Sequence, residues 1–150
     1  MTVQSCPEGD PGAFWAVNAT GTLERGEEVP SPDPELTVWP PVGAEPVVLD
    51  SFYADRALTG FGYGPAFQGL CAAWRRGDDV FVEAELPEGT GPGGFALHPA
   101  LFDAALHGTS LLVGDGVVPF SWEGVALHAE GAVAVRGRLS LVAPDRVRVT

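Results

Sequence analysis

The stretch that decides the fold is FALHPALFDAALHGTSLL, residues 95–112. Pro99 suits the first position of a helix, because the N–H group that proline lacks has no partner there in any case. The residues that follow are almost all Leu, Phe and Ala, a composition typical of a buried helix. The segment therefore predicts a buried apolar helix that begins at Pro99.

Strands are expected on both sides of this helix. Residues 67–74 and 80–86 predict a hairpin around the turn RRGDD, and in the second strand apolar residues alternate with Phe81, Glu83 and Glu85. After the helix, the pattern predicts strands at 118–128, 132–142 and 146–150. A single apolar helix between strands predicts an antiparallel sheet wrapped around it, an α+β fold of the hot-dog type.

The first third of the chain is different in composition. Residues 13–23 alternate as a half-buried strand, and TVQS near the N-terminus is its expected hairpin partner. Residues 24–47 are rich in proline and acidic residues, which predicts an irregular linker anchored by Trp39. Residues 48–60 predict a short helix, with an apolar side made of Phe52, Tyr53 and Leu58.

Length and charge exclude several classes of function. A chain of 150 residues with 45% hydrophobic residues fits one globular domain with its own core. A net charge of −12 argues against binding to nucleic acid or to an anionic membrane. The sequence shows no signal-peptide pattern, no membrane span, no metal-binding cluster and no disulfide framework, so we expect a cytoplasmic protein without a metal.

Asp103 and His107 are the candidate chemical pair. Their spacing of four residues places both side chains on one side of the predicted helix. The pair could transfer protons, with Asp103 as acid or base and His107 as its orienting neighbour. It could also be an ordinary surface contact, or Asp103 could be a charge favoured near a helix N-terminus. Spacing leaves all three interpretations open.

Other polar residues carry weaker signals. His98 precedes Pro99 and fits a helix cap, and His128 fits a packed or surface position in a strand. Tyr63 lies between two glycines, where it could present its hydroxyl to a ligand or belong to a rigid turn. The sequence contains neither a G-x-S-x-G nucleophile elbow nor a phosphate-binding glycine motif.

Three longer motifs resemble a known family. YGPAFQGL (63–70), HPALFDAALH (98–107) and VPFSWEGVALHA (118–129) resemble the dehydratase domain of modular type I polyketide synthases. FWAVNATGTL and WPPVGAEPV are similar to the connecting region of that family, and AAWRRGDDVFVEAELPE to its following hairpin. The family fold is a double hot-dog, with its active site between two halves. The resemblance implies that residues 1–23 are the last strands of the first hot-dog, 24–47 the linker and 48–150 the second hot-dog.

The resemblance also implies a reaction. The family removes water from a β-hydroxyacyl chain that is held by the phosphopantetheine of an acyl carrier protein, and has no further cofactor. Asp103 matches the general acid, His107 the residue that orients it, and Tyr63 a tyrosine near the substrate. A carboxyl on an apolar helix is expected to stay protonated, as a proton donor requires. Further expected substrate contacts are Gly64, Pro65, Phe67, Pro119 and Phe120.

Three departures from the family bear on activity. The family takes its base from a His-x-x-x-Gly-x-x-x-x-Pro motif in the first half, which this sequence does not contain. Asn18 replaces a usual histidine, and the chain ends before the last expected strands. We therefore expect an inactive, association-prone piece whose partners are the first half, neighbouring synthase domains and a carrier protein. Alternatives are a degenerate dehydratase serving as a docking module and a single hot-dog that forms a homodimer.

Overall fold

The structure, a computed structural model, describes residues 1–9, 12–24, 33–114 and 116–150 and forms two compact units, Met1–Ser31 and Pro32–Thr150. In the first unit, β1 (Thr2–Ser5) pairs antiparallel with β2 (Ala16–Thr20), which confirms the predicted hairpin. Asn18 lies in this hairpin and donates a hydrogen bond to the Ser5 hydroxyl at 3.0 Å.

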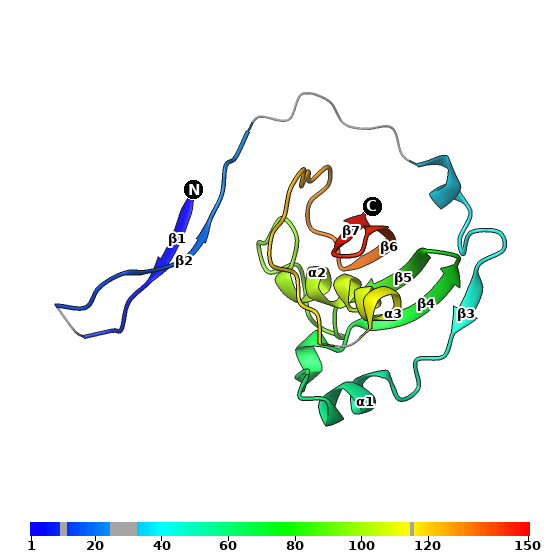
Figure 1. Cartoon of the computed structure of the whole chain (residues 1–150), viewed down its shortest axis with the longest axis horizontal. Helices are drawn as coiled ribbons and strands as arrows, with labels where there is room; N and C mark the ends of the chain where they lie inside the picture. Colours follow the sequence, from blue (N-terminus) through cyan, green and yellow to red (C-terminus); the bar gives the residue numbers. More distant parts are fainter. Residues whose placement is uncertain (10–11, 25–32, 115) are drawn as a thin grey trace. The chain divides into compact units, whose positions relative to one another are not determined.

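The second unit is a five-stranded antiparallel sheet with the strand order β3-β4-β5-β6-β7. The strands are β3 (Glu45–Val47), β4 (Leu70–Arg76), β5 (Asp79–Glu85), β6 (Ala134–Ala143) and β7 (Arg146–Val149). The helices are α1 (Phe52–Leu58), α2 (Pro99–Leu106) and α3 (Ser110–Val113), with 3-10 turns η1 (Pro34–Thr37), η2 (Pro65–Phe67) and η3 (His107–Thr109). Figure 1 shows the sheet curving around α2, as the hot-dog prediction requires.

The core lies between α2 and the centre of the sheet. Every second residue of β5 faces the helix, and the fully buried side chains there are Val80, Val82, Ala84, Leu101, Ala104 and Leu139. Each large side chain in this group contributes about 1.5–3 kcal/mol through its removal from water. The same alternation was the basis for predicting the strand, so burial follows the sequence pattern here.

The opposite face of β5 is covered by the segment that precedes β3. Phe81 is fully buried because the Trp39 ring packs against it, with 6.0 Å between ring centroids. Trp39 also contacts Trp74 edge-to-face at 5.9 Å, an arrangement that aromatic rings favour. The prediction that Trp39 anchors its segment onto a surface is therefore confirmed.

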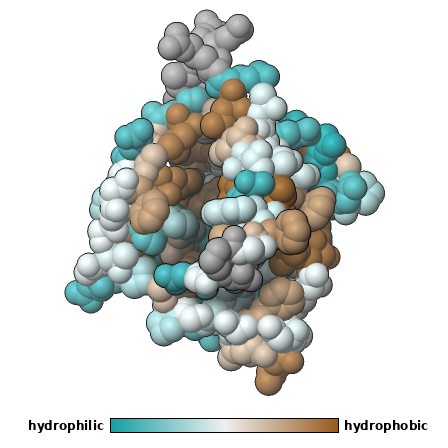
Figure 2. Space-filling view, turned by 90° about the vertical axis from the view of Figure 1, so that its left-hand side faces the viewer, coloured by the Kyte–Doolittle hydropathy of each residue, from teal (hydrophilic) through white to brown (hydrophobic). Residues whose placement is uncertain are grey.

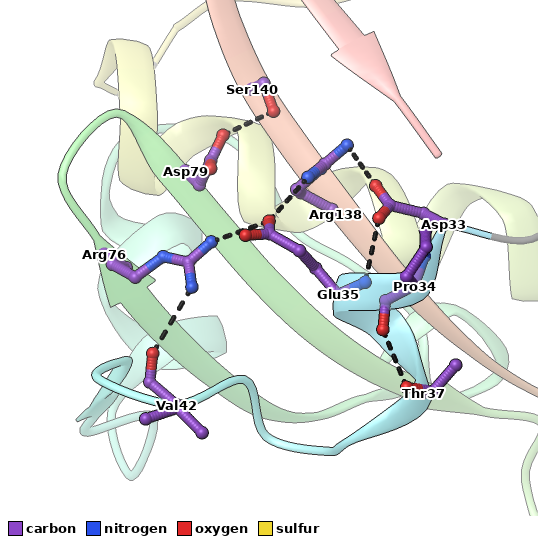
Figure 3. Close-up of polar contacts among 9 residues, drawn as sticks. All are labelled: Asp33, Pro34, Glu35, Thr37, Val42, Arg76, Asp79, Arg138 and Ser140. Atoms are coloured by element: carbon purple, nitrogen blue, oxygen red, sulfur yellow. Dashed lines mark hydrogen bonds and ion pairs between the residues drawn. The ribbon is translucent and has the colours of Figure 1, made fainter.

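Two arginines hold the same segment to the sheet (Figure 3). Arg138 on β6 contacts Asp33 at 2.7 Å and Glu35 at 3.3 Å. Arg76 on β4 contacts the same Glu35 carboxylate at 3.0 Å and donates to the Val42 carbonyl at 3.3 Å. We call this group, Asp33, Glu35, Arg76 and Arg138, the outer clamp.

The strand prediction for residues 118–128 is wrong. The structure places exposed, irregular backbone there, and none of the five strands of the sheet pairs with it. An alternating pattern does not form a strand without a strand to pair with. Phe120 shows the result, since its side chain is 99% exposed. His128 consequently lies on exposed irregular backbone and not in a strand.

Two other expectations need adjustment. The segment 24–47 contains the short edge strand β3 and the turn η1, although its residues 25–32 lie outside the described part. The predicted single helix is an α-helix only to Leu106 and continues as η3 and α3. Among the residues that the structure describes, no helix is long and apolar enough to cross a membrane.

Candidate active site

Helix α2 carries the predicted pair and begins as the sequence indicates. Pro99 occupies its first turn, and Nδ1 of His98 accepts a hydrogen bond from the Ala100 N–H at 3.2 Å. His98 is thus the N-cap, which satisfies an amide that the helix itself leaves without a partner. This confirms the capping interpretation of His98.

The structure brings Asp103 and His107 together. Their spacing of four residues places Nε2 of His107 3.1 Å from Oδ2 of Asp103. The two side chains differ in exposure, because 3% of the His107 side chain and 45% of the Asp103 side chain are accessible. The Asp103 side chain is therefore partly accessible to solvent, although the helix that carries it is largely buried.

Burial sets the charge of the imidazole. Removal from water lowers the pKa of His107 below its ordinary value, and the nearby Asp103 carboxylate opposes this effect only in part. The guanidinium of Arg56 lowers the same pKa further. His107 is therefore neutral at neutral pH, and a neutral imidazole carries one N–H donor and one acceptor nitrogen.

Nδ1 of His107 faces a tyrosine that sequence reasoning did not assign to the site. The hydroxyl of Tyr53 lies 3.1 Å from Nδ1 of His107 and accepts a hydrogen bond from the Leu70 N–H at 2.8 Å. Tyr53 belongs to α1, where the sequence placed it on an apolar side. The sequence held one clue to this role: Tyr53 puts a hydroxyl on the apolar side of its helix, and a buried hydroxyl needs a hydrogen-bond partner.

Aromatic rings surround the imidazole. The ring of Tyr63 lies 4.2 Å from that of His107, centroid to centroid, and contacts Tyr53 edge-to-face at 5.7 Å. Phe52 lies 6.3 Å from the imidazole on another side. Tyr63 therefore lies beside His107, and its contact with a substrate stays a prediction. Its backbone carbonyl accepts a hydrogen bond from the Gln68 side chain at 2.8 Å.

The other predicted contacts lie on exposed loops. Gly64 precedes η2, Pro65 lies in it, and the Phe67 side chain at its end is 42% exposed. Pro119 and Phe120 are exposed, and the neighbouring Trp122 ring contacts Phe102 of α2 at 5.2 Å. The structure thus brings the 117–127 segment to α2 through Trp122, and it does not place the Phe120 side chain against the Asp103–His107 pair.

In the described ranges, no group of three or more His, Cys, Asp and Glu side chains lies close enough together to hold a metal ion. The site instead combines a half-exposed carboxyl with a buried neutral imidazole on the helix of a hot-dog sheet. This arrangement defines a hot-dog domain with an acid–imidazole pair.

Comparisons with known proteins identify the family. The family model described as "Polyketide synthase dehydratase N-terminal domain" matches residues 31–149. The chain is 48% identical to mycoketide-CoA synthase of Mycobacterium tuberculosis over 94% of its length, and 51% identical to polyketide synthase GfsA of Streptomyces halstedii over 93%. It spans only 4% and 2% of the length of these two relatives.

Solved structures agree with this assignment. The chain superposes on the erythromycin dehydratase with a TM-score of 0.85 and 38% identity, covering 99% of this chain and 55% of that one. A dehydratase studied for the borrelidin and fluvirucin polyketide synthases gives a TM-score of 0.85 and 43% identity, with 99% and 52% covered. The chain belongs to the polyketide synthase dehydratase family, and it spans about half the length of these solved chains.

Proposed function

We propose that this chain is the acid-bearing part of a dehydratase that removes water from a β-hydroxyacyl thioester on an acyl carrier protein. One observation carries the proposal: a single carboxyl, Asp103, is held by a buried imidazole at 3.1 Å, and its side chain remains 45% exposed. Family membership supplies the reaction class, and the partial exposure of the Asp103 side chain supplies access for a substrate.

In the proposed reaction, a base removes the α-proton, the Cα–Cβ double bond forms and the Cβ–O bond breaks. Asp103 gives its proton to the departing oxygen, which leaves as water because hydroxide is a poor leaving group. The products are an α,β-unsaturated thioester and one water molecule; the base has gained the α-proton, and Asp103 has lost the proton that leaves in the water. The thioester remains on the phosphopantetheine of the carrier protein.

The base in this proposal comes from the histidine motif of the first half of the domain. His107 is unsuited to that role, since both of its nitrogens already face partners, Tyr53 and Asp103. His98 is occupied as the helix cap. We accordingly expect the isolated 150 residues to release no water from a β-hydroxyacyl thioester, as measured by mass spectrometry.

Substitution of the acid tests the proposal. In the complete protein that contains this chain, Asp103→Asn is expected to lower dehydration of a β-hydroxyacyl carrier-protein substrate by about 100-fold or more, because the amide cannot donate the required proton. Asp145→Asn makes the same chemical change on the exposed turn between β6 and β7 and is expected to retain activity. Mass spectrometry of the acyl chain measures both.

The outcome also distinguishes the alternative function. Full turnover by Asp103→Asn contradicts the role of Asp103. A complete protein that gives no dehydration even with the native Asp103 contradicts the enzymatic proposal and supports a docking or structural module instead.

A further inference from the structure

The hydroxyl of Tyr53 occupies a position that determines where its proton points. The Leu70 N–H donates to its oxygen at 2.8 Å, and Nδ1 of His107 lies 3.1 Å away. An amide N–H can only donate, so the tyrosine oxygen is the acceptor in the first contact. The hydroxyl keeps its own proton, which it can donate to Nδ1 of His107 in the second contact.

This contact selects one form of the neutral imidazole. When Nδ1 accepts a hydrogen bond, the single ring proton resides on Nε2. Nε2 lies 3.1 Å from Oδ2 of Asp103, so it donates to that oxygen. A continuous series of hydrogen bonds thus runs from the Leu70 amide through Tyr53 and His107 to the carboxyl.

The direction of these bonds matters for an acid. With Oδ2 accepting from His107, a proton that binds the carboxyl is carried by the other oxygen, Oδ1, from which it can be given to a substrate. In the opposite tautomer, the bare Nε2 would instead accept the proton of Asp103 and hold it inside the pair. The geometry around Tyr53 therefore decides whether the acid points its proton outward.

The surroundings keep Tyr53 protonated and the His107 imidazole neutral. Burial raises the pKa of Tyr53 to about 12, so it remains a hydroxyl donor across the physiological range. The charged groups that influence His107 are Asp103 on its own helix and Arg56 on α1, and burial is the larger effect on its pKa. The ring of Tyr63 packs on the imidazole from the loop before η2.

We propose that Tyr53 is a positioning residue that fixes the Nε2–H tautomer of His107 and thereby orients the proton of Asp103. This inference rests on the proposed dehydratase function for its kinetic consequence, whereas the tautomer itself can be measured without any substrate. Tyr53 acts through His107 and is not itself a catalytic residue.

A kinetic test compares Tyr53→Phe with the native residue in the complete protein. The change removes one oxygen and keeps the ring that packs on Phe52 and Tyr63. We expect kcat for dehydration to fall by roughly tenfold, because a mispositioned acid loses part of its effect. KM is expected to stay within about twofold, since the Tyr53 hydroxyl contacts His107 and the Leu70 amide.

Making the same change in a His107→Gln variant separates a positioning role of Tyr53 from a packing role. In His107→Gln, the side-chain amide always has an N–H₂ donor and has no tautomer to select. Tyr53→Phe is therefore expected to cost much less in the Gln background than in the His background. An equal loss in both backgrounds overturns the proposal, because a packing role would reduce activity in either.

A spectroscopic test reads the tautomer directly. Solid-state ¹⁵N NMR of the histidine-labelled complete protein distinguishes protonated from unprotonated ring nitrogens, and the His107 signals are those lost in His107→Gln. We expect protonation at Nε2 in the native protein and a mixture of tautomers in the Tyr53→Phe variant. Protonation at Nδ1 with the native residue, or an unchanged pattern in the variant, overturns the proposal.

The tests of Tyr53 can be distinguished from the test of the proposed dehydratase function. If Asp103→Asn retains full dehydration, the acid role fails while the NMR pattern still decides what Tyr53 does. If Asp103→Asn is inactive and Tyr53→Phe leaves the tautomer unchanged, only the role of Tyr53 fails.

Discussion

At the scale of single residues, the site depends on how closely η3 approaches the sheet. His107 opens this 3-10 turn and Gly108 follows it, with both residues buried. A Cβ atom at position 108 would lie 2.6 Å from Cγ1 of Val82 and 3.0 Å from Cδ1 of Leu139. Only glycine therefore lets the backbone beside His107 rest directly on β5 and β6.

Gly108→Ala is predicted to destabilise the fold by about 1–3 kcal/mol, the usual cost of forcing an extra carbon into a packed core. Urea unfolding followed by circular dichroism measures the change. Gly91→Ala is the matched control, because no atom lies within 4 Å of the added carbon there. Its expected effect is within about 0.5 kcal/mol. Equal stabilities of the two variants would contradict the packing argument.

At the scale of elements, the outer clamp attaches an irregular segment to the sheet. The Arg138 and Asp33 side chains are 19% and 21% exposed, so their ion pair is largely shielded from solvent. The pair between Arg146 and Glu123 is much more open, with 66% and 79% of the side chains exposed. Shielded pairs lose more when one partner is removed, because the other charge is left without water or a partner.

Arg138→Gln is predicted to destabilise the protein by about 1 kcal/mol and to speed hydrogen exchange in residues 33–42, while the β4–β5 hairpin stays protected. Hydrogen exchange with mass spectrometry and urea unfolding measure the two effects. Arg146→Gln serves as the control with an expected loss below about 0.5 kcal/mol. The same loss in both variants, or unchanged exchange in 33–42, would speak against the clamp.

At the scale of the whole molecule, many large apolar side chains are exposed, and hydrophobic patches lie among hydrophilic ones on the face drawn in Figure 2. Within the second unit, the segment 117–127 contributes several of them: Val117, Val118, Phe120, Trp122, Val125 and Leu127. So many exposed apolar side chains in one segment favour its being covered by another protein surface.

The isolated chain is therefore predicted to self-associate as its concentration rises, which sedimentation velocity measures. Phe120→Ser is expected to weaken this association without loss of stability, because the side chain is 99% exposed. Leu58→Ser, at an 87% exposed position on α1, is the control outside the 117–127 segment. A chain that stays monomeric at every concentration would refute the prediction.

Much of the fold could be predicted because it depends on local patterns. The alternation along β5 predicted its buried side, and the turn RRGDD predicted the hairpin in which Gly77 adopts a φ of +59°. The pairing of Asp103 with His107 followed from helical spacing alone. The α1 helix was also expected, but Leu58 is 87% exposed, because only one side of so short a helix reaches the core.

The sequence by itself determined which residues can form strands, helices and a hydrogen-bonded acid–imidazole pair, because period and spacing act within one element. Tertiary structure alone decided that Glu45–Val47 joins the sheet, that 118–128 does not, and that the Tyr53 hydroxyl meets Nδ1 of His107. The reason is physical: edge pairing and partner selection depend on which groups the rest of the chain brings near, and the partner of Tyr53 lies 54 residues away along the sequence.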